Sequence, residues 1–270
     1  MLERTPRPAT LLAGVALVTV AAGTQVVAQA ATVAPHQAAV GSTTAPAAER
    51  SAPYRWATID RTKRGYLYTA GLQDSHLVVT RSGGRLRFVD SGTARWDRLP
   101  GACRKEKARG IAATCRIPAS RSERHPLKLK IVPRLGDDVI EASSLSAAFN
   151  LRVLADAGRD VVHTGAGDDF VNGAQNRDRV RGGAGNDWIR TGIGNDSIRG
   201  GSGRDRLVGV DGEETIRGGK GNDRIGGGSG HDRLYAGRGR DHLLCGSGRD
   251  SARADRGDRV SRDCERVKRG

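Results

Sequence analysis

Acidic side chains recur at every ninth residue through the second half of the chain, and the period holds over eleven positions without a shift. These positions are Asp160, Asp169, Asp178, Asp187, Asp196, Asp205, Glu214, Asp223, Asp232, Asp241 and Asp250. Hard cations such as Ca²⁺ take carboxylate and backbone carbonyl oxygens as ligands. A lone aspartate in a turn more often bonds its own backbone. Eleven acids in register instead predict rows of calcium ligands.

The residues around each acid define a nine-residue unit, G-G-x-G-x-D-x-U-x, which is complete in residues 182–190 and 218–226. A glycine stands two residues before the acid in ten of eleven repeats, with Asn176 as the exception, and an aliphatic residue or alanine stands two residues after it. Glycine permits the positive φ of tight turns. The residues x-U-x form a short strand whose central side chain points inward. Two units therefore make one coil, which stacks equivalent acids about 4.7–4.9 Å apart.

Residues 155–254 resemble the RTX (haemolysin-type) calcium-binding nonapeptide array. The resemblance implies an all-β fold, namely a right-handed parallel β-roll (β-solenoid) with Ca²⁺ between successive turns. It also implies an exported bacterial chain that folds on meeting extracellular calcium. Two repeats depart from the pattern, because Ala174 and Asn176 replace glycines in one and Glu214 replaces the aspartate in another. We expect the sites that these repeats build to be weak or empty.

Residues 1–30 have the pattern of an export signal. Two arginines precede an apolar run at residues 11–23, and Ala28-Gln29-Ala30 matches a cleavage site. The apolar run is too short to span a bilayer. Residues 31–52 are rich in Ala, Pro and Thr, which is typical of a disordered linker. We therefore predict a mature protein that is secreted or held at the cell surface, without a transmembrane segment.

Residues 53–134 form a basic, β-rich leader in this interpretation. Short strand-like runs are expected at residues 54–59, 66–69, 76–80, 85–89, 111–117 and 127–132. The roll itself is expected at residues 135–254. The leader is either a small β-sandwich or an irregular β segment on which the first coils of the roll pack. We favour the second, because Val153 stands nine residues before Val162 and extends the register upstream. A solenoid needs caps, and residues 255–270 form the C-terminal one.

The chain has four cysteines in two local pairs, Cys103 with Cys115 and Cys245 with Cys264. An even number of cysteines in an exported chain favours disulfides. Three connectivities can be drawn, and the local one closes a basic loop in the leader and ties the last repeats to the tail. Zinc binding would need clustered pairs such as C-x-x-C, which the sequence lacks.

Positive charge is concentrated in the leader. Residues 53–134 contain 19 Lys and Arg against 6 Asp and Glu, whereas residues 155–254 contain 16 against 15. At the period of one coil, four arginines of the array should form an outward ladder: Arg181, Arg199, Arg217 and Arg253. Such surfaces suit anionic wall polymers, polysaccharide or DNA, although a solvated face is the simpler interpretation. Nucleic acid is disfavoured, because the few aromatic residues of the array are scattered and do not interleave with the ladder.

Catalytic motifs are absent from the sequence. It contains no H-E-x-x-H, G-x-S-x-G or Walker loop, and its six histidines share no spacing. We therefore predict a protein that is not an enzyme. Three functions remain in order of preference: a calcium-dependent structural or adhesion module, binding of a polyanion (wall polymer, polysaccharide or DNA) by the basic leader of residues 53–134, and an enzyme or toxin of unrecognised type.

Overall fold

The computed structural model describes residues 56–270. The predicted export signal and linker, residues 1–30 and 31–52, lie outside this range. The described chain consists of β-strands, turns and loops, with no helix. These residues therefore include no helix that is long and apolar enough to cross a membrane.

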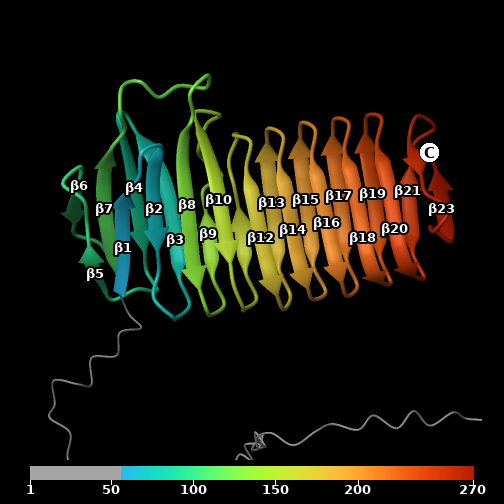
Figure 1. The fold of residues 1–270 in the computed structure, drawn as a ribbon, viewed down its shortest axis with the longest axis horizontal. Coiled ribbons are helices and arrows are strands. Elements are labelled where there is room, and N and C mark those ends of the chain that lie inside the picture. The colour runs from blue at the N-terminus through green and yellow to red at the C-terminus, as the bar shows by residue number, and fades with distance from the viewer. Residues whose placement is uncertain (1–55) are drawn as a thin grey trace, which may run out of the picture. The chain divides into compact units, whose positions relative to one another are not determined.

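The strands form two sheets that run the length of the described chain (Figure 1). In chain order, the first sheet contains β1 (Trp56–Arg61), β2 (Gly65–Thr69), β5 (Arg95–Arg98), β8 (Leu127–Arg134), β10 (Phe149–Ala155), β12 (Phe170–Gln175), β14 (Trp188–Ile193), β16 (Arg206–Asp211), β18 (Arg224–Gly230), β20 (His242–Gly248) and β22 (Arg259–Val260). The second contains β3 (His76–Ser82), β4 (Arg85–Asp90), β6 (Cys103–Glu106), β7 (Ile111–Arg116), β9 (Val139–Glu141), β11 (Val161–His163), β13 (Arg179–Ala184), β15 (Ser197–Ser202), β17 (Thr215–Lys220), β19 (Arg233–Arg238), β21 (Ser251–Ala254) and β23 (Arg266–Arg269).

From β8 onward successive strands alternate between the sheets, and every pairing is parallel with a nearly constant register. Ile189 pairs with Leu207 and Leu207 with Ile225, while Ile198 pairs with Ile216 in the other sheet. Each of these aliphatic side chains is at most 1% exposed. The nine-residue period therefore produces a parallel β-roll, as predicted, with one inward aliphatic residue from each strand as its core.

The leader joins the same two sheets and adds antiparallel hairpins to them. Strand β2 runs parallel to β8, and β3 runs parallel to β9, so both sheets continue into the leader. Antiparallel pairing then links β1 to β2, β3 to β4, β4 to β7, and β7 to β6. This continuity agrees with a β segment that lays the first coils of the roll.

Both disulfides join the cysteines that are close in sequence, as predicted. Cys103 and Cys115 are facing residues of the β6–β7 hairpin. Cys245 lies in β20, and its partner Cys264 lies in the tail that follows β22. One disulfide therefore braces an outer hairpin of the leader, and the other ties the tail to the last coils.

The outward rows of the roll correct one expectation from the sequence. The predicted arginine ladder is present, but Tyr235 lies within it, between Arg217 and Arg253, and the Arg217 guanidinium is 4.7 Å from the centroid of its ring. Phe170 and Trp188 are neighbours on the first sheet, with ring centroids 5.1 Å apart. The expectation of scattered aromatics was wrong, because residues one coil apart in sequence are adjacent on the sheet.

Candidate metal centre

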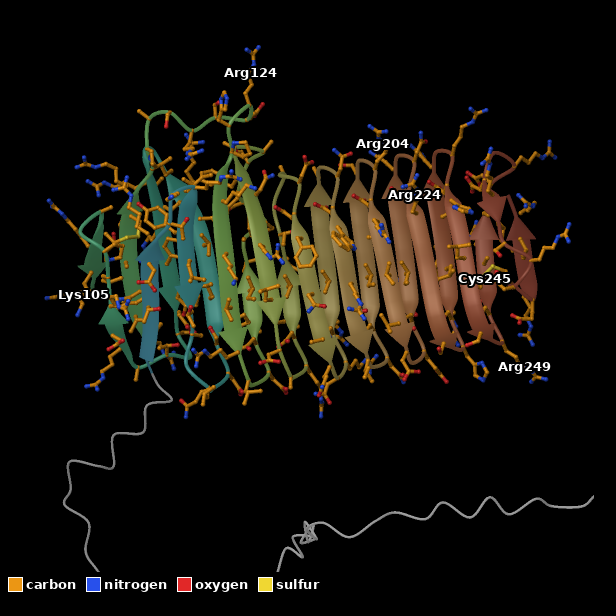
Figure 2. The ribbon with its side chains drawn as sticks, in the orientation of Figure 1. Lys105, Arg124, Arg204, Arg224, Cys245 and Arg249 are labelled. Carbon is orange, nitrogen blue, oxygen red and sulfur yellow. A yellow bond between two sulfur atoms is a disulfide. The ribbon has the colours of Figure 1, made fainter. Side chains whose placement is uncertain are left out.

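The acids of the repeats lie in two rows along opposite edges of the roll. Arg204 and Arg249, each next in sequence to an acid of a different row, project from opposite edges in Figure 2. Asp169, Asp187, Asp205, Asp223 and Asp241 precede strands of the first sheet. Asp160, Asp178, Asp196, Glu214, Asp232 and Asp250 precede strands of the second. All eleven side chains are buried, with none more than 3% exposed.

One oxygen of each aspartate accepts a hydrogen bond from the coil before it. The N–H of Asp187 donates to Oδ1 of Asp205, and the N–H of Asp205 donates to Oδ1 of Asp223, both at 2.9 Å. In the other row the N–H of Asp160 donates to Oδ1 of Asp178 at 2.9 Å. The rows thus connect successive coils through a backbone donor and a carboxylate acceptor.

The second carboxylate oxygen of nearly every aspartate is left without a partner. The Oδ2 atoms that are buried and unpaired among the described residues belong to Asp138, Asp160, Asp178, Asp187, Asp196, Asp205, Asp223, Asp232, Asp241 and Asp250. A buried polar atom without a hydrogen bond is costly, and a buried charge more so. Each row therefore presents a line of oxygens that require a partner from outside the chain.

Burial raises the pKa of several of these carboxyl groups. It raises the pKa of Asp178 and Asp187 to about 8 and that of Asp160 and Asp223 to about 6. Backbone hydrogen bonds oppose the shift, and neighbouring carboxylates of the same row add to it. A cation beside the row would act in the opposite direction, because it favours the charged form.

The first glycine of the repeat leaves space for the carboxylate. A Cβ atom on Gly182 would lie 2.2 Å from Oδ2 of Asp187 and 2.8 Å from the carbonyl oxygen of Gly200. A Cβ on Gly200 would meet Oδ2 of Asp205 at 2.3 Å and the carbonyl oxygen of Gly218 at 2.8 Å. An unpaired carboxylate oxygen and a carbonyl oxygen of the next coil therefore approach the same small space.

This donor set fits calcium. Among residues 56–270, no three His, Cys, Asp or Glu side chains come together as a metal-ligand cluster. A cation held at the rows would instead take carboxylate and carbonyl oxygens, which Ca²⁺ prefers. Structural zinc would require sulfur or imidazole ligands, and all four cysteines are in disulfides.

The two departing repeats keep the fold but alter the rows. Ala174 and Asn176 hold positive φ angles of 77° and 72°, which glycine adopts more readily. At Glu214 both carboxylate oxygens are unpaired among the described residues, so the series of hydrogen bonds is interrupted there. The N–H of Glu214 still donates to Oδ1 of Asp232 at 2.9 Å. That these sites are weak or empty stays a prediction.

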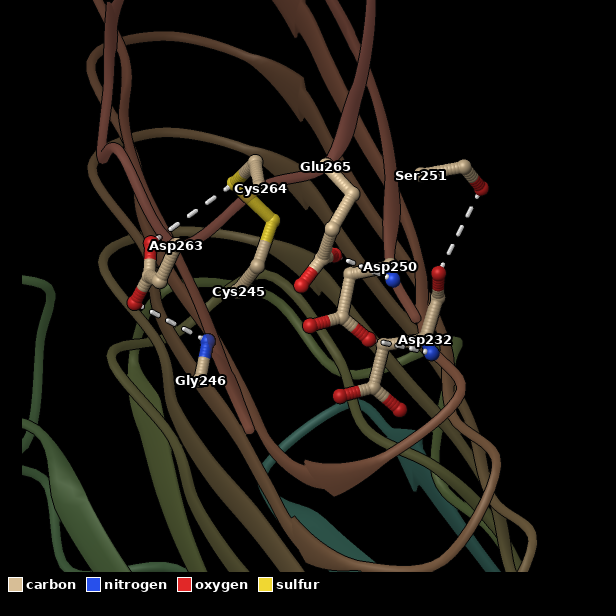
Figure 3. The surroundings of a disulfide bond; sticks show 8 residues. All are labelled: Asp232, Cys245, Gly246, Asp250, Ser251, Asp263, Cys264 and Glu265. Atoms are coloured by element: carbon tan, nitrogen blue, oxygen red, sulfur yellow. Dashed lines mark hydrogen bonds between the residues drawn. A yellow bond between two sulfur atoms is a disulfide. The ribbon is translucent and has the colours of Figure 1, made fainter. Parts of the chain in front are cut away.

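Three further acids, which the nine-residue period missed, extend the rows at both ends. The N–H of Ser75 donates to Oδ1 of Asp138 at 2.6 Å, and the N–H of Asp241 donates to Oδ1 of Asp258 at 2.9 Å. The N–H of Asp250 donates to Oε2 of Glu265 at 2.7 Å (Figure 3). Irregular loop lengths break the period at these acids. Each is nevertheless followed two residues later by an aliphatic residue, and that shorter pattern could have identified them.

The tail completes the second row next to the disulfide. Figure 3 shows the carboxylates of Asp232, Asp250 and Glu265 following one another, with the bond between Cys245 and Cys264 beside them. Cys245 is fully buried and Cys264 is 7% exposed. The covalent bond therefore holds the last acid of the row against the final coil.

Comparison with known families identifies the repeat. The RTX calcium-binding nonapeptide repeat matches residues 152–180, 173–207 and 208–243. No curated protein and no solved structure matches the chain. The matched segments coincide with the buried carboxylate rows and with the parallel β-roll. Residues 152–243 of this chain therefore contain RTX-type nonapeptide repeats, a repeat that binds calcium ions.

Proposed function

We propose that this protein is an exported β-roll that folds on binding calcium and serves as a structural or adhesion module outside the cell, without enzymatic activity. The observation that supports the proposal is the line of buried, unpaired carboxylate oxygens along each edge of the roll. We assign the repeat acids, Asp160 to Asp250, as the calcium ligands together with turn carbonyls. Extracellular calcium modules work with dissociation constants on the order of 10⁻⁴–10⁻³ M.

Coupling of calcium binding to folding follows from the composition of the roll. Each strand contributes one inward aliphatic side chain, so the apolar core is thin. Glycine loses more backbone freedom on folding than other residues, and glycine is frequent in every coil. The free energy of calcium binding then becomes free energy of folding, as in other metal-dependent domains.

Circular dichroism of residues 31–270, with both disulfides oxidised, tests this proposal. We expect a cooperative gain of β signal as calcium is raised from a chelated solution to about 5 mM. Magnesium at the same concentration should not produce the gain, because it demands compact octahedral geometry and keeps its water. An unchanged spectrum throughout the calcium titration would contradict the proposal.

A second candidate function, binding of an anionic wall polymer or polysaccharide, is favoured by an outward row on the first sheet. In register, this row contains Lys130, Arg152, Phe170, Trp188, Arg206, Arg224, His242 and Arg259. The Arg152 guanidinium lies 4.7 Å from the Phe170 ring centroid, and that of Arg206 lies 5.4 Å from the Trp188 centroid. The row therefore combines cationic groups with an aromatic pair, the half-buried Phe170 and the exposed Trp188, and a sugar ring can stack against Trp188.

Binding of polygalacturonate, an anionic polysaccharide, tests the second candidate. We expect Arg206→Gln and Trp188→Ala each to weaken binding several-fold, and binding to fall steeply with salt. Arg190→Gln is the matched control. Arg190 is exposed and lies on the same strand as Trp188, but it pairs with Asn172 and Val208, which are outside the row. Equal loss in the control and in Arg206→Gln would rule the row out as the binding surface.

A further inference from the structure

A cavity in the leader gathers four arginines without an acidic residue. Its volume is about 480 Å³, and Arg61, Arg85, Arg104 and Arg116 line it around Tyr66. No acidic residue contributes to the lining. Within residues 56–270, the side chains of these four arginines make no hydrogen bond, ion pair or ring contact. Positive charge in this cavity is therefore not neutralised by the described part of the chain.

The sheets themselves force like charges together here. Arg85 and Arg116 are directly opposite each other in the antiparallel pairing of β4 with β7, and like charges in that relation destabilise a sheet. Arg61 faces Tyr66 across β1 and β2. The Tyr66 hydroxyl donates to the carbonyl oxygen of Arg116 at 2.7 Å, which links the two sheets at this point. A bound anion would convert this repulsion into attraction.

The leader's ion pairs lie outside the cavity. Arg87 pairs with Glu106 at 2.8 Å, and Arg98 pairs with Asp60 at 3.3 Å. None of these four residues lines the cavity. Arg87 and Arg98 are thus already paired with an acid, whereas the four arginines of the cavity converge without one.

The disulfide fixes two of the cavity arginines. Arg104 and Arg116 directly follow the bonded cysteines Cys103 and Cys115. The hairpin that carries them, β6–β7, lies at the leader end of the described chain, where Figure 2 labels Lys105. The covalent bond reduces the freedom of this edge hairpin, and such preorganisation favours ligand binding.

A smaller neighbouring cavity adds a buried donor. Its volume is about 180 Å³, it shares Arg61 and Tyr66 with the first cavity, and it adds Lys63 and Arg121. The Nε atom of Arg121 is buried and has no hydrogen-bond partner among the described residues. A buried donor without a partner is costly, so this atom independently indicates an acceptor that the chain does not supply.

We propose that the two cavities together form a binding site for a phosphate group. Guanidinium forks match the oxygens of phosphate in a bidentate manner. Several arginines around one space suit a multiply charged anion better than a single carboxylate. This site is separate from the second candidate function, because it involves none of the residues of the outward row on the roll.

The phosphate could come from a free phosphomonoester or from a phosphodiester polymer. The probe for the first is glycerol 3-phosphate, with glycerol as the uncharged control, titrated by calorimetry into residues 31–270 in calcium. We expect saturable binding of glycerol 3-phosphate and none of glycerol. Poly(glycerol phosphate) tests the second source: tighter binding of the polymer, displaced by glycerol 3-phosphate, would identify a phosphodiester chain as the partner.

Two variants decide whether the cavity is the site. Arg116→Gln should weaken binding of glycerol 3-phosphate about tenfold or more, since charge-assisted hydrogen bonds are lost. Arg87→Gln removes an arginine that is already paired outside the cavity, and it should bind as the wild type does. The proposal is overturned if glycerol 3-phosphate does not bind saturably, or if both variants weaken binding equally.

Thermal unfolding separates a binding role from a structural one. In phosphate-free buffer, Arg116→Gln should unfold at the same temperature as the wild type or higher, because it relieves repulsion from Arg85. Glycerol 3-phosphate should raise the melting temperature of the wild type and not of the variant. If the variant is less stable without ligand, Arg116 acts as a structural residue and the proposal fails. That outcome would leave the second candidate function untouched, because the effect of Arg206→Gln on polygalacturonate binding is measured separately.

Discussion

The leader and the roll share two sheets but are stabilised by different means. The fully buried aromatic side chains, Tyr68, Phe88 and Phe149, all lie before residue 150, although the aliphatic residues of the array are buried as completely. In the leader, the Tyr68 and Phe88 rings stack with centroids 6.3 Å apart, and Trp96 meets Tyr68 edge-on. The array buries one small aliphatic residue per strand, together with two rows of carboxyl groups. An apolar core supports the first region, whereas the proposed function makes the second depend on a cation.

A change of pH should produce the largest difference in stability between the roll and the leader. The folded-state pKa values of Asp178 and Asp187, both about 8, lie above the unfolded value of about 4. Between about pH 4 and pH 8, the calcium-free folded roll therefore binds more protons than the unfolded chain, and its stability falls as pH rises through that window. In chelator, we expect more β signal by circular dichroism at pH 5 than at pH 8.

Calcium should reverse this dependence, because protons compete with the cation for the same carboxylates. In calcium, the roll should lose affinity for the ion as the pH falls below about 6. A chelated roll that is equally folded at pH 5 and pH 8 would show that the buried carboxyl groups do not limit its stability.

Truncation of a core side chain should have the next largest effect, and it should act differently in the two regions. Phe88→Ala should cost about 3–5 kcal/mol of leader stability at any calcium concentration. Leu207→Ala, at an equivalent depth in the roll, should instead raise the calcium concentration needed for folding. Denaturant unfolding in calcium and in chelator measures both. If Phe88→Ala acts mainly by changing the calcium requirement, the leader does not have an independent core.

Glu214 allows a smaller test within the roll. Glu214→Asp should restore a hydrogen bond to the interrupted row and stabilise the roll by about 1 kcal/mol. The calcium midpoint should then move to a lower concentration. The control is Glu213→Asp, which changes an exposed neighbour whose N–H donates to Asn195. A midpoint that shifts equally in both variants would mean that Glu214 is not a defect of the row.

The sequence predicted the roll well, because one period specifies the turn, the strand and the inward residue together. Once two units make a coil, residues such as Asp187 and Asp205 must be neighbours. The local disulfides followed from short separations in sequence. Phe170 and Trp188 are likewise one coil apart, so they are neighbours on the first sheet although the sequence suggested scattered aromatics.

The leader was less predictable, because no repeat relates its strands. Strands β5 and β6 have the sequences RWDR and CRKE, which show little apolar alternation. Strand β5 pairs with β1, far earlier in the chain, while β6 pairs with the neighbouring β7 beside the disulfide between Cys103 and Cys115. The pairing of Arg85 with Arg116 likewise depends on a register that the sequence does not reveal, so the anion cavity could only be found in three dimensions.

Hydrogen exchange of residues 31–270, with and without calcium, tests the central claim most directly. It measures backbone protection segment by segment and so compares the two regions in one molecule. We predict that chelation removes protection from residues 155–254 while β2, β3, β4 and β7 of the leader stay protected. Protection of the roll that survives chelation at pH 8 would contradict a fold that depends on calcium.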